Sequence, residues 1–150
     1  MKQSYREYVK LNKNLFLAIV VAVIFSAVAA QLLADQEDYL NSSYTLLVDL
    51  VVFYSAFGML FYVDNRKKYR TDLGQVDSPR LKKDLIKIVT SVGAGEIVYM
   101  GVRWYLQYYL LTINYEPYMA SLVTHLISAT VYLAIVNLGV KLTRLYKDDA

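Results

Sequence analysis

The chain has 150 residues, of which 57% are hydrophobic, a formal net charge of +3 and no cysteine. Its mean hydropathy of +0.31 does not suit the surface of a water-soluble domain. The absence of cysteine excludes disulfides, thiolate chemistry, iron–sulfur clusters and cysteine zinc sites. The apolar residues form four blocks, each long enough to cross a hydrocarbon core about 30 Å thick, which takes about 20 residues. This composition predicts an all-α, multi-pass membrane protein with almost no domain outside the membrane.

The first apolar block covers residues 15–34 and contains no ionisable side chain. A basic segment precedes it, and Ala27-Val28-Ala29 lies inside it, which together resemble a cleavable secretory signal. The block is, however, longer than the apolar core of about 7–15 residues that is usual in such signals. We therefore expect a retained first span that anchors the chain in the bilayer.

The second predicted span covers residues 44–63 and is interrupted by Asp49. The connection before it is acidic and offers three candidate helix N-caps: Asn41, Ser42 and Ser43. Residues 64–85 form the longest polar segment, which is rich in Lys and Arg. Within that segment, Ser78-Pro79 fits the N-cap and the first residue of a third helix.

The third helix is predicted to run from Pro79 to about Leu111, with its membrane part at residues 86–111. At 1.5 Å per residue it is about 50 Å long, which exceeds the thickness of the membrane, so its first turns extend into the cytoplasm or lie along the surface. Glu96 and Arg103 lie two turns apart on one face of this helix. The fourth span is predicted at residues 118–140, just after Pro117.

The distribution of positive charge predicts the orientation of the four spans. Four of the 16 basic residues precede span one, eight lie between span two and the base of span three if Lys87 is counted, three follow span four, and Arg103 lies inside the bilayer. Cytoplasmic connections are enriched in Lys and Arg. We therefore expect a four-helix bundle in the cell membrane, with both termini and the basic loop in the cytoplasm. Such clusters are typical of topology signals and of contacts with anionic lipid, which argues against a nucleic-acid surface.

Five polar residues fall inside the predicted spans: Asp49, Glu96, Arg103, His125 and Asn137. Counting from the span midpoints places Asp49, Arg103 and His125 about 7–8 Å to the outer side of the bilayer centre. Glu96 lies close to the centre, and Arg103 leans toward it because helical side chains tilt toward their N-terminus. Asp49 and Glu96 are therefore both candidate partners of Arg103. Asn137, on the inner half, is placed to hydrogen-bond between helices.

Three interpretations of this polar set remain open. The simplest is a structural Asp49–Arg103 ion pair that fixes the helix register, with Glu96 protonated or hydrogen-bonded to Tyr54, Tyr99 or a serine. The second is a pathway for a proton, an ion or a solute, because intramembrane ionisable groups are default candidates for such roles. The third is a metal or catalytic site, which one histidine and two carboxylates support only weakly. We predict no catalytic residue, cofactor or metal ligand.

Small residues are dense around Glu96, and we expect them to let span three pack closely on a neighbour. They are Ser91, Gly93, Ala94, Gly95 and Gly101. Ser91 and Gly95 have the spacing of the small-xxx-small motif of membrane helices. The alternative is that these glycines leave room beside Glu96 for water, an ion or a ligand. Span two has a similar group at residues 55–58, so spans two and three are the predicted close pair.

The four-span layout is similar to that of several families of small membrane proteins, but their motifs are not matched. Small multidrug transporters place an essential carboxylate in the first span, which has none here. Membrane-associated eicosanoid and glutathione enzymes share the layout without a matching glutathione-binding motif. Flippase-type accessory proteins of polyprenyl-sugar pathways share it without a motif that matches residue by residue. A shared layout does not give function.

The leading functional hypothesis is a small, non-catalytic integral subunit of a larger membrane complex, such as a respiratory or metal-dependent oxidase or oxygenase assembly. It rests on the lack of a catalytic signature or a soluble domain. The alternative is a small homo-oligomeric transporter or channel for protons, ions or solutes in which Glu96 titrates. A third reading, an enzyme acting on a lipid or small apolar substrate, requires a bound metal. The implied partners are the lipid bilayer, other integral subunits or copies of the chain, and anionic lipid at the basic loop, but no nucleic acid.

Overall fold

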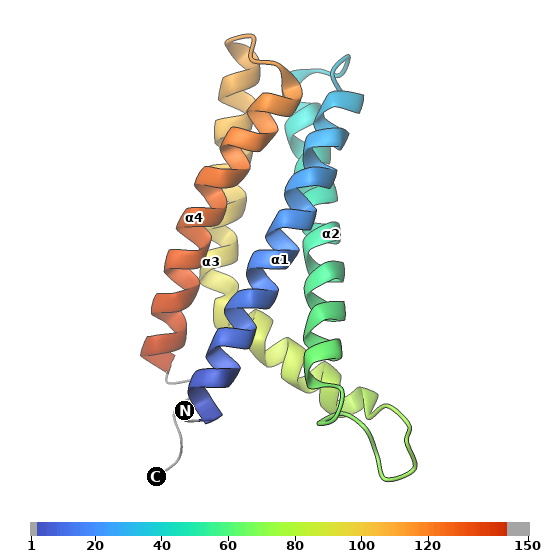
Figure 1. Cartoon of the computed structure of the whole chain (residues 1–150). Coiled ribbons are helices and arrows are strands. Elements are labelled where there is room, and N and C mark those ends of the chain that lie inside the picture. The colour runs from blue at the N-terminus through green and yellow to red at the C-terminus, as the bar shows by residue number, and fades with distance from the viewer. Residues whose placement is uncertain (1–2, 144–150) are drawn as a thin grey trace.

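The structure is a computed structural model that describes residues 3–143, without the side chains of residues 3, 4, 87, 91, 92, 94 and 139–143. These residues form four long helices and no strand (Figure 1). The helices are α1 (Gln3–Leu32), α2 (Asp38–Asn65), α3 (Ser78–Thr112) and α4 (Pro117–Thr143). Among the described residues, α1, α2 and α4 each contain a segment long and apolar enough to cross a membrane, and α3 is a fourth if its two halves count as one span. The predicted all-helical, multi-pass membrane character is confirmed at this level.

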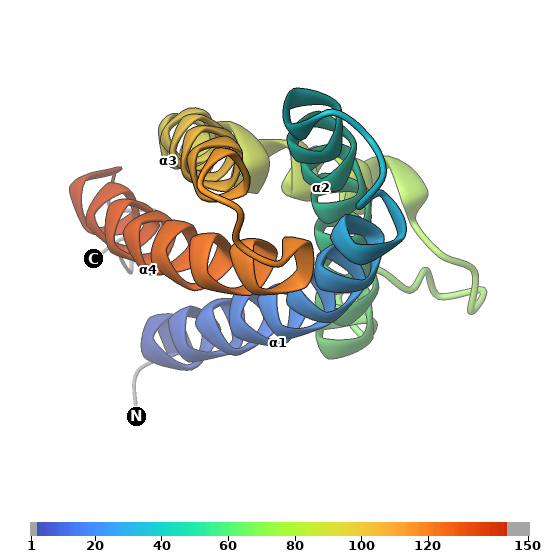
Figure 2. The same ribbon diagram turned by 90° about the horizontal axis from the view of Figure 1, so that it is seen from above.

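The helices pack as two hairpins. Contact is most extensive between α1 and α2 and between α3 and α4, whereas α1–α4 and α2–α3 contacts are smaller, with α2–α3 the smallest of these. Figure 2 shows the four helices side by side around a common interior. The predicted close pairing of spans two and three is therefore wrong. Short connections at residues 33–37 and 113–116 keep consecutive helices adjacent, whereas the longer loop at residues 66–77 allows α2 and α3 to separate.

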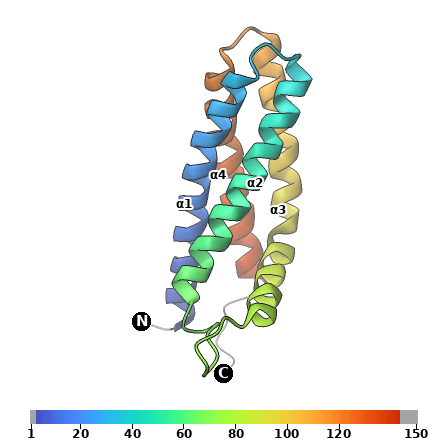
Figure 3. The same ribbon diagram turned by 90° about the vertical axis from the view of Figure 1, so that its right-hand side faces the viewer.

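The two ends of the bundle differ in charge. Figures 1 and 3 show the start of α1, the end of α4 and the 66–77 loop together at one end, which we call the basic end. The short connections lie at the opposite, acidic end, where the charged residues include Asp35, Glu37, Asp38 and Glu116. A bilayer around the helices would therefore separate basic from acidic connections.

The interior is polar toward the acidic end and aromatic toward the basic end. Fully buried side chains in the polar half include Asn41, Thr45, Asp49, Arg103, Gln107, Thr124 and His125. In the aromatic half, Phe53, Phe57, Phe61 and Tyr69 follow one another with ring centroids 6.0–6.2 Å apart. The outer surface instead exposes many large apolar side chains on all four helices. A polar interior inside an apolar surface suits lipid surroundings, where exposed apolar side chains cost nothing.

The residues at the helix ends agree only in part with the predicted helix caps. Asn41, Ser42 and Ser43, predicted as N-caps, lie inside α2, which begins at Asp38. Asn41 instead donates hydrogen bonds of 2.9 Å to the carbonyls of Ala30 and Leu33, and so satisfies the end of α1. The N-cap of α3 is Asp77, one residue before the predicted Ser78, and its carboxylate accepts from the Arg80 amide. Pro117 begins α4 as predicted.

Helix α3 bends by 62° between its halves Ser78–Thr90 and Gly95–Thr112 (Figure 1). Sharp bends of this kind occur at serine and glycine groups, and Gly93 lies within the break. The second half runs along the bundle, whereas the first half turns aside at the basic end. This arrangement agrees with the expectation that the start of an over-long third helix leaves the path of the span.

Candidate functional site

Three helices bring an acid, a guanidinium and an imidazole together in the polar half of the bundle. Asp49 of α2, Arg103 of α3 and His125 of α4 are each at most 1% exposed. The Asp49 carboxylate lies 3.6 Å from Arg103 Nε and 3.3 Å from His125 Nδ1. The sequence-based depth estimate had placed these three residues at one level. The structure therefore assigns Asp49, and not Glu96, as the acidic neighbour of Arg103.

The Arg103 guanidinium is held mainly by uncharged groups. Its Nη1 donates to Gln107 Oε1 on α3. The same nitrogen donates to Thr124 Oγ1 on α4, at a distance of 2.5 Å. Its Nη2 donates to Ser121 Oγ at 2.9 Å. Gln107 in turn donates to Asn41 Oδ1 at 3.0 Å, which extends the network to α2 and, through Asn41, to the end of α1. The cation is thus fixed within a network that ties the acidic ends of all four helices together.

Asp49 is the meeting point of the ionisable groups. Tyr99 donates a hydrogen bond to Asp49 Oδ2, and His125 and Arg103 approach the same carboxylate. His125 Nδ1 also lies 3.4 Å from Ser26 Oγ on α1. Asp49 Oδ1 and Arg103 Nε are nevertheless buried without a hydrogen bond. A buried polar atom without a hydrogen-bond partner costs free energy, because it has lost its contacts with water. A small movement or a water molecule at this point would therefore change the free energy of the site substantially.

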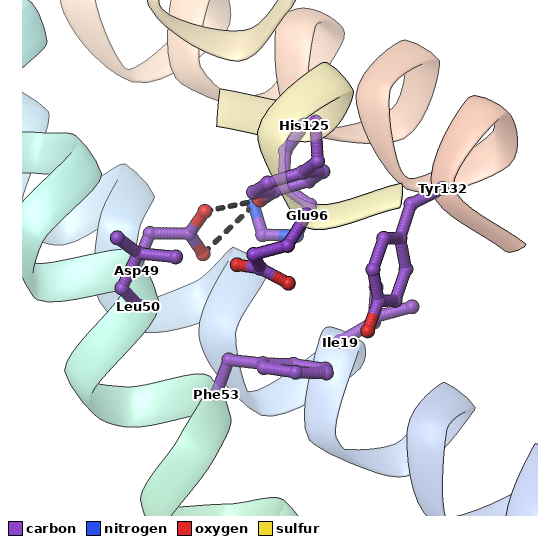
Figure 4. Close-up of a pocket in the computed structure, with 8 residues that line it drawn as sticks. Ile19, Asp49, Leu50, Phe53, Glu96, His125 and Tyr132 are labelled. Carbon is purple, nitrogen blue, oxygen red and sulfur yellow. Dashed lines mark hydrogen bonds and ion pairs between the residues drawn. The ribbon is translucent and has the colours of Figure 1, made fainter. Parts of the chain in front are cut away.

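A small cavity lies directly beside this cluster, on the side toward the bundle centre. Its volume is about 10 Å³, about the room that one water molecule needs. It is lined by Ile19, Asp49, Leu50, Phe53, Glu96, Tyr99, His125 and Tyr132. Figure 4 shows the carboxyl groups of Asp49 and Glu96 facing the same space from α2 and α3. Both predicted carboxylates and the predicted histidine therefore line one cavity.

Glu96 has a different environment from Asp49. It is only partly buried, and it interacts with the Tyr54 hydroxyl, one of the partners anticipated from the sequence. Tyr132 lies across the cavity from it (Figure 4). Among the described residues, no Lys or Arg side chain lines the cavity, so His125 is the basic group that shares this space with Glu96.

The remaining predicted residues are spread over the molecule. Asn137 accepts a hydrogen bond from Tyr8, which links α4 to α1, and it is not among the residues that line the cavity. A Cβ at Gly95 would meet Ile135 and Val136 of α4 at 3.3 and 3.4 Å, so this glycine allows a close approach to α4 and not to α2. A Cβ at Gly93 or Gly101 would meet no atom within 4 Å, so neither position makes a close helix contact in this bundle. The Ser91 side chain lies outside the described residues.

Several residues of the site were not singled out from the sequence, although a signal for them exists. Helix α2 buries Asn41, Thr45, Asp49, Phe53, Phe57 and Phe61, and α3 buries Gly95, Tyr99, Arg103, Gln107 and Leu111, each at intervals of four residues. Neighbouring side chains along one helix face recur at this spacing. A polar stripe with a period of four inside an apolar span would have pointed to Thr45 and Gln107. Tyr99 was a candidate partner of Glu96, but its hydroxyl donates to Asp49 instead.

The described residues contain no group of three or more His, Asp and Glu side chains arranged to hold a metal ion. Asp49, Glu96 and His125 line one cavity but do not converge as a ligand set. The donor geometry therefore gives no support to the metal-dependent enzyme hypothesis.

No protein-family model, curated protein or solved structure matches this chain. The case for a function therefore rests on the cavity and the buried network.

Proposed function

We propose that this protein is a small transporter of the cell membrane that moves protons, alone or together with a small polar solute, with Glu96 as the proton-exchanging group. In this proposal α3 is the fourth span, and the basic end faces the cytoplasm, because cytoplasmic connections are enriched in Lys and Arg. One observation favours a transporter over a non-catalytic complex subunit, namely the cavity that Glu96 shares with Asp49 and His125.

The charge balance of the interior supports proton exchange at this cavity. Asp49 and Arg103 cancel each other's charge, which leaves one carboxyl group, Glu96, and one imidazole, His125, beside the same space. The interior stays neutral if Glu96 holds a proton and His125 is uncharged, or if the proton lies on His125 instead. An uncompensated charge in a bilayer is costly, so these neutral arrangements are favoured. The cavity has room for about one water molecule to carry a proton between them.

The position of Asp49 supports a coupling between protonation and helix movement. Asp49 belongs to the α1–α2 hairpin, whereas Tyr99, Arg103 and His125 belong to the α3–α4 hairpin. Contact between the hairpins is less extensive than contact within them. A change of charge at the cavity would therefore act on the interface where the packing is weakest. Rocking of two such units around a central site is a known way to open a site to one side at a time.

The test is proton flux in liposomes containing the purified protein, followed with an internal pH-sensitive dye after a pH step. Glu96→Gln should reduce the flux at least tenfold, because the amide keeps the shape of the side chain but cannot exchange a proton. Glu116→Gln is the matched control, because Glu116 is exposed in the acidic-end connection, and it should leave the flux unchanged. Both variants should keep the helical circular dichroism of the parent protein. Flux that persists in Glu96→Gln, or the absence of flux in the parent protein, contradicts the proposal.

The second candidate remains a non-catalytic subunit of a larger membrane complex, and a different observation favours it. Ser55 and Gly101 are exposed, and no atom lies within 4 Å of a Cβ built at Gly58 or Gly101. Small residues on the outside of α2 and α3 would let a further helix approach closely in lipid. Purification from native membranes in mild detergent distinguishes the two candidates, since a subunit co-migrates with larger partners. Gly58→Leu should then disrupt that association without reducing the helix content.

A further inference from the structure

The first half of α3 has the side-chain pattern of a helix that lies in a membrane interface. Leu81, Leu85 and Ile88 pack toward the bundle, whereas Ile86 is 54% exposed and Val89 is also exposed. The basic side chains of this half with described surroundings, Arg80, Lys82 and Lys83, are exposed as well. Because of the 62° bend, this half crosses the basic end instead of following the bundle axis (Figure 1). An exposed apolar flank beside a basic flank is typical of helices at the boundary of headgroups and acyl chains.

The loop before this helix is held in a defined shape and presents an apolar tip. The Thr71 amide donates to the Gln75 carbonyl at 2.9 Å, the Gly74 amide donates to the Thr71 carbonyl at 2.8 Å, and Arg70 and Val76 form a bridge. Gly74 has φ +77°, a conformation that glycine adopts easily. Leu73, beside it, is 87% exposed. An exposed leucine at the turn of a hairpin suits contact with an apolar phase, such as the acyl chains of a membrane.

This hairpin is fixed to the start of α3 by Tyr69. The Tyr69 side chain is fully buried beneath Phe61, and its hydroxyl donates to Asp84 Oδ2 at 2.7 Å. Lys68 Nζ approaches the same carboxylate oxygen at 2.7 Å. The loop and the first half of α3 therefore form one unit, and the exposed cations Arg66, Lys67 and Arg70 belong to it together with Arg80, Lys82 and Lys83.

We infer that this unit, residues 66–90, is a binding surface for the headgroups of anionic phospholipids in the leaflet at the basic end. Its exposed apolar side chains Leu73 and Ile86 reach the acyl boundary, and its cations contact the phosphates. Charge complementarity selects anionic lipid as the occupant, because Lys and Arg next to a span are attracted to a negatively charged leaflet. The inference does not depend on transport, since it concerns a surface at the end of the bundle and not the cavity.

The test is the quenching of a tryptophan placed at Ile86 by brominated lipids. Ile86→Trp is made in a Trp104→Phe background, which removes the only native tryptophan, and the protein is reconstituted with equal mole fractions of brominated phosphatidylglycerol or brominated phosphatidylcholine. We expect at least about twofold stronger quenching by the anionic lipid, reduced by 0.5 M NaCl because salt screens the headgroup attraction. Leu73→Trp in the same background provides a second reporter if the first variant is unstable.

Matched charge variants test which cations select the lipid. Lys82→Gln combined with Lys83→Gln should remove the preference for the anionic lipid. Arg6→Gln combined with Lys10→Gln removes the same charge from α1 at the same end and should keep the preference. Equal quenching by the two lipids would show a contact without headgroup selection and overturn the inference. Absence of quenching by either lipid would also overturn it, because the surface would then face water or a protein partner.

Discussion

Removing either member of the Asp49–Arg103 pair should destabilise the protein far more than removing both. Asp49→Asn leaves Arg103 buried with its three uncharged partners but without a negative charge. Arg103→Gln leaves the Asp49 carboxylate with only Tyr99 and His125. Breaking a buried pair from one side typically costs about 3–5 kcal/mol. Single hydrogen bonds between membrane helices contribute only about 0.6 kcal/mol on average, so the charge imbalance dominates.

We therefore expect each single variant to lose about 3 kcal/mol of unfolding free energy and the double variant to lose much less than the sum. The coupling energy of the cycle should be about 2 kcal/mol or more, within the range for contacting residues. The measurement is reversible unfolding in mixed micelles, followed by circular dichroism. Two control cycles are available in the chain. Lys13 and Asp64 form a partly exposed pair at 2.6 Å, for which a coupling of about 0–1 kcal/mol is expected.

The second control cycle pairs Arg103 with Glu96, the alternative partner that the sequence left open. Its coupling should stay below about 0.5 kcal/mol, because Glu96 lies two turns away on the same helix and interacts with Tyr54. Additive losses in the Asp49–Arg103 cycle, or a larger coupling between Glu96 and Arg103, would refute the assignment of Asp49 as the counter-charge.

Two further predictions concern helix packing and the 66–77 loop. Gly95→Leu should lower the melting temperature, because overpacking against Ile135 and Val136 costs about 1–3 kcal/mol, while Gly101→Leu at an open position should have little effect. Burial raises the pKa of the Asp84 carboxyl, but hydrogen bonds from Lys68 and Tyr69 outweigh it and hold the pKa below the ordinary 3.8. When the pKa of a carboxyl group is lower in the folded than in the unfolded protein, its contribution to stability is full above the unfolded-state pKa. That contribution is lost as the pH falls through the folded-state pKa. The difference in melting temperature between the parent protein and Asp84→Asn should therefore be full near pH 6 and shrink below pH 4.

The polar residues inside the spans were predictable individually, because an ionisable side chain is conspicuous in an apolar block. Counting residues from the span midpoints also predicted the same membrane depth for Asp49, Arg103 and His125, and these three side chains are neighbours in the structure. It did not distinguish Asp49 from Glu96 as the neighbour of Arg103. That choice depends on how α2 and α3 are rotated about their axes, which residue spacing within one helix does not determine.

The packing partners of the small residues were not predictable in the same way. Glycine and serine groups on α2 and α3 suggested that these two helices pack closely, yet Gly95 contacts α4 and Gly58 faces open space. A small-residue group shows that a helix can be approached closely, but any neighbour can take that place. The short connections at the acidic end decided the outcome, since they pair α1 with α2 and α3 with α4.

The amino-acid sequence alone determined the all-helical, multi-pass membrane character and the separation of basic from acidic connections. These properties depend on local composition and on distance along the chain. Only the tertiary structure decided that the polar side chains form one network from Asn41 to His125, and that Glu96 lines the same cavity as Asp49 and His125. The physical reason is that a helix presents its side chains in all directions, and only packing selects which of them face a common interior.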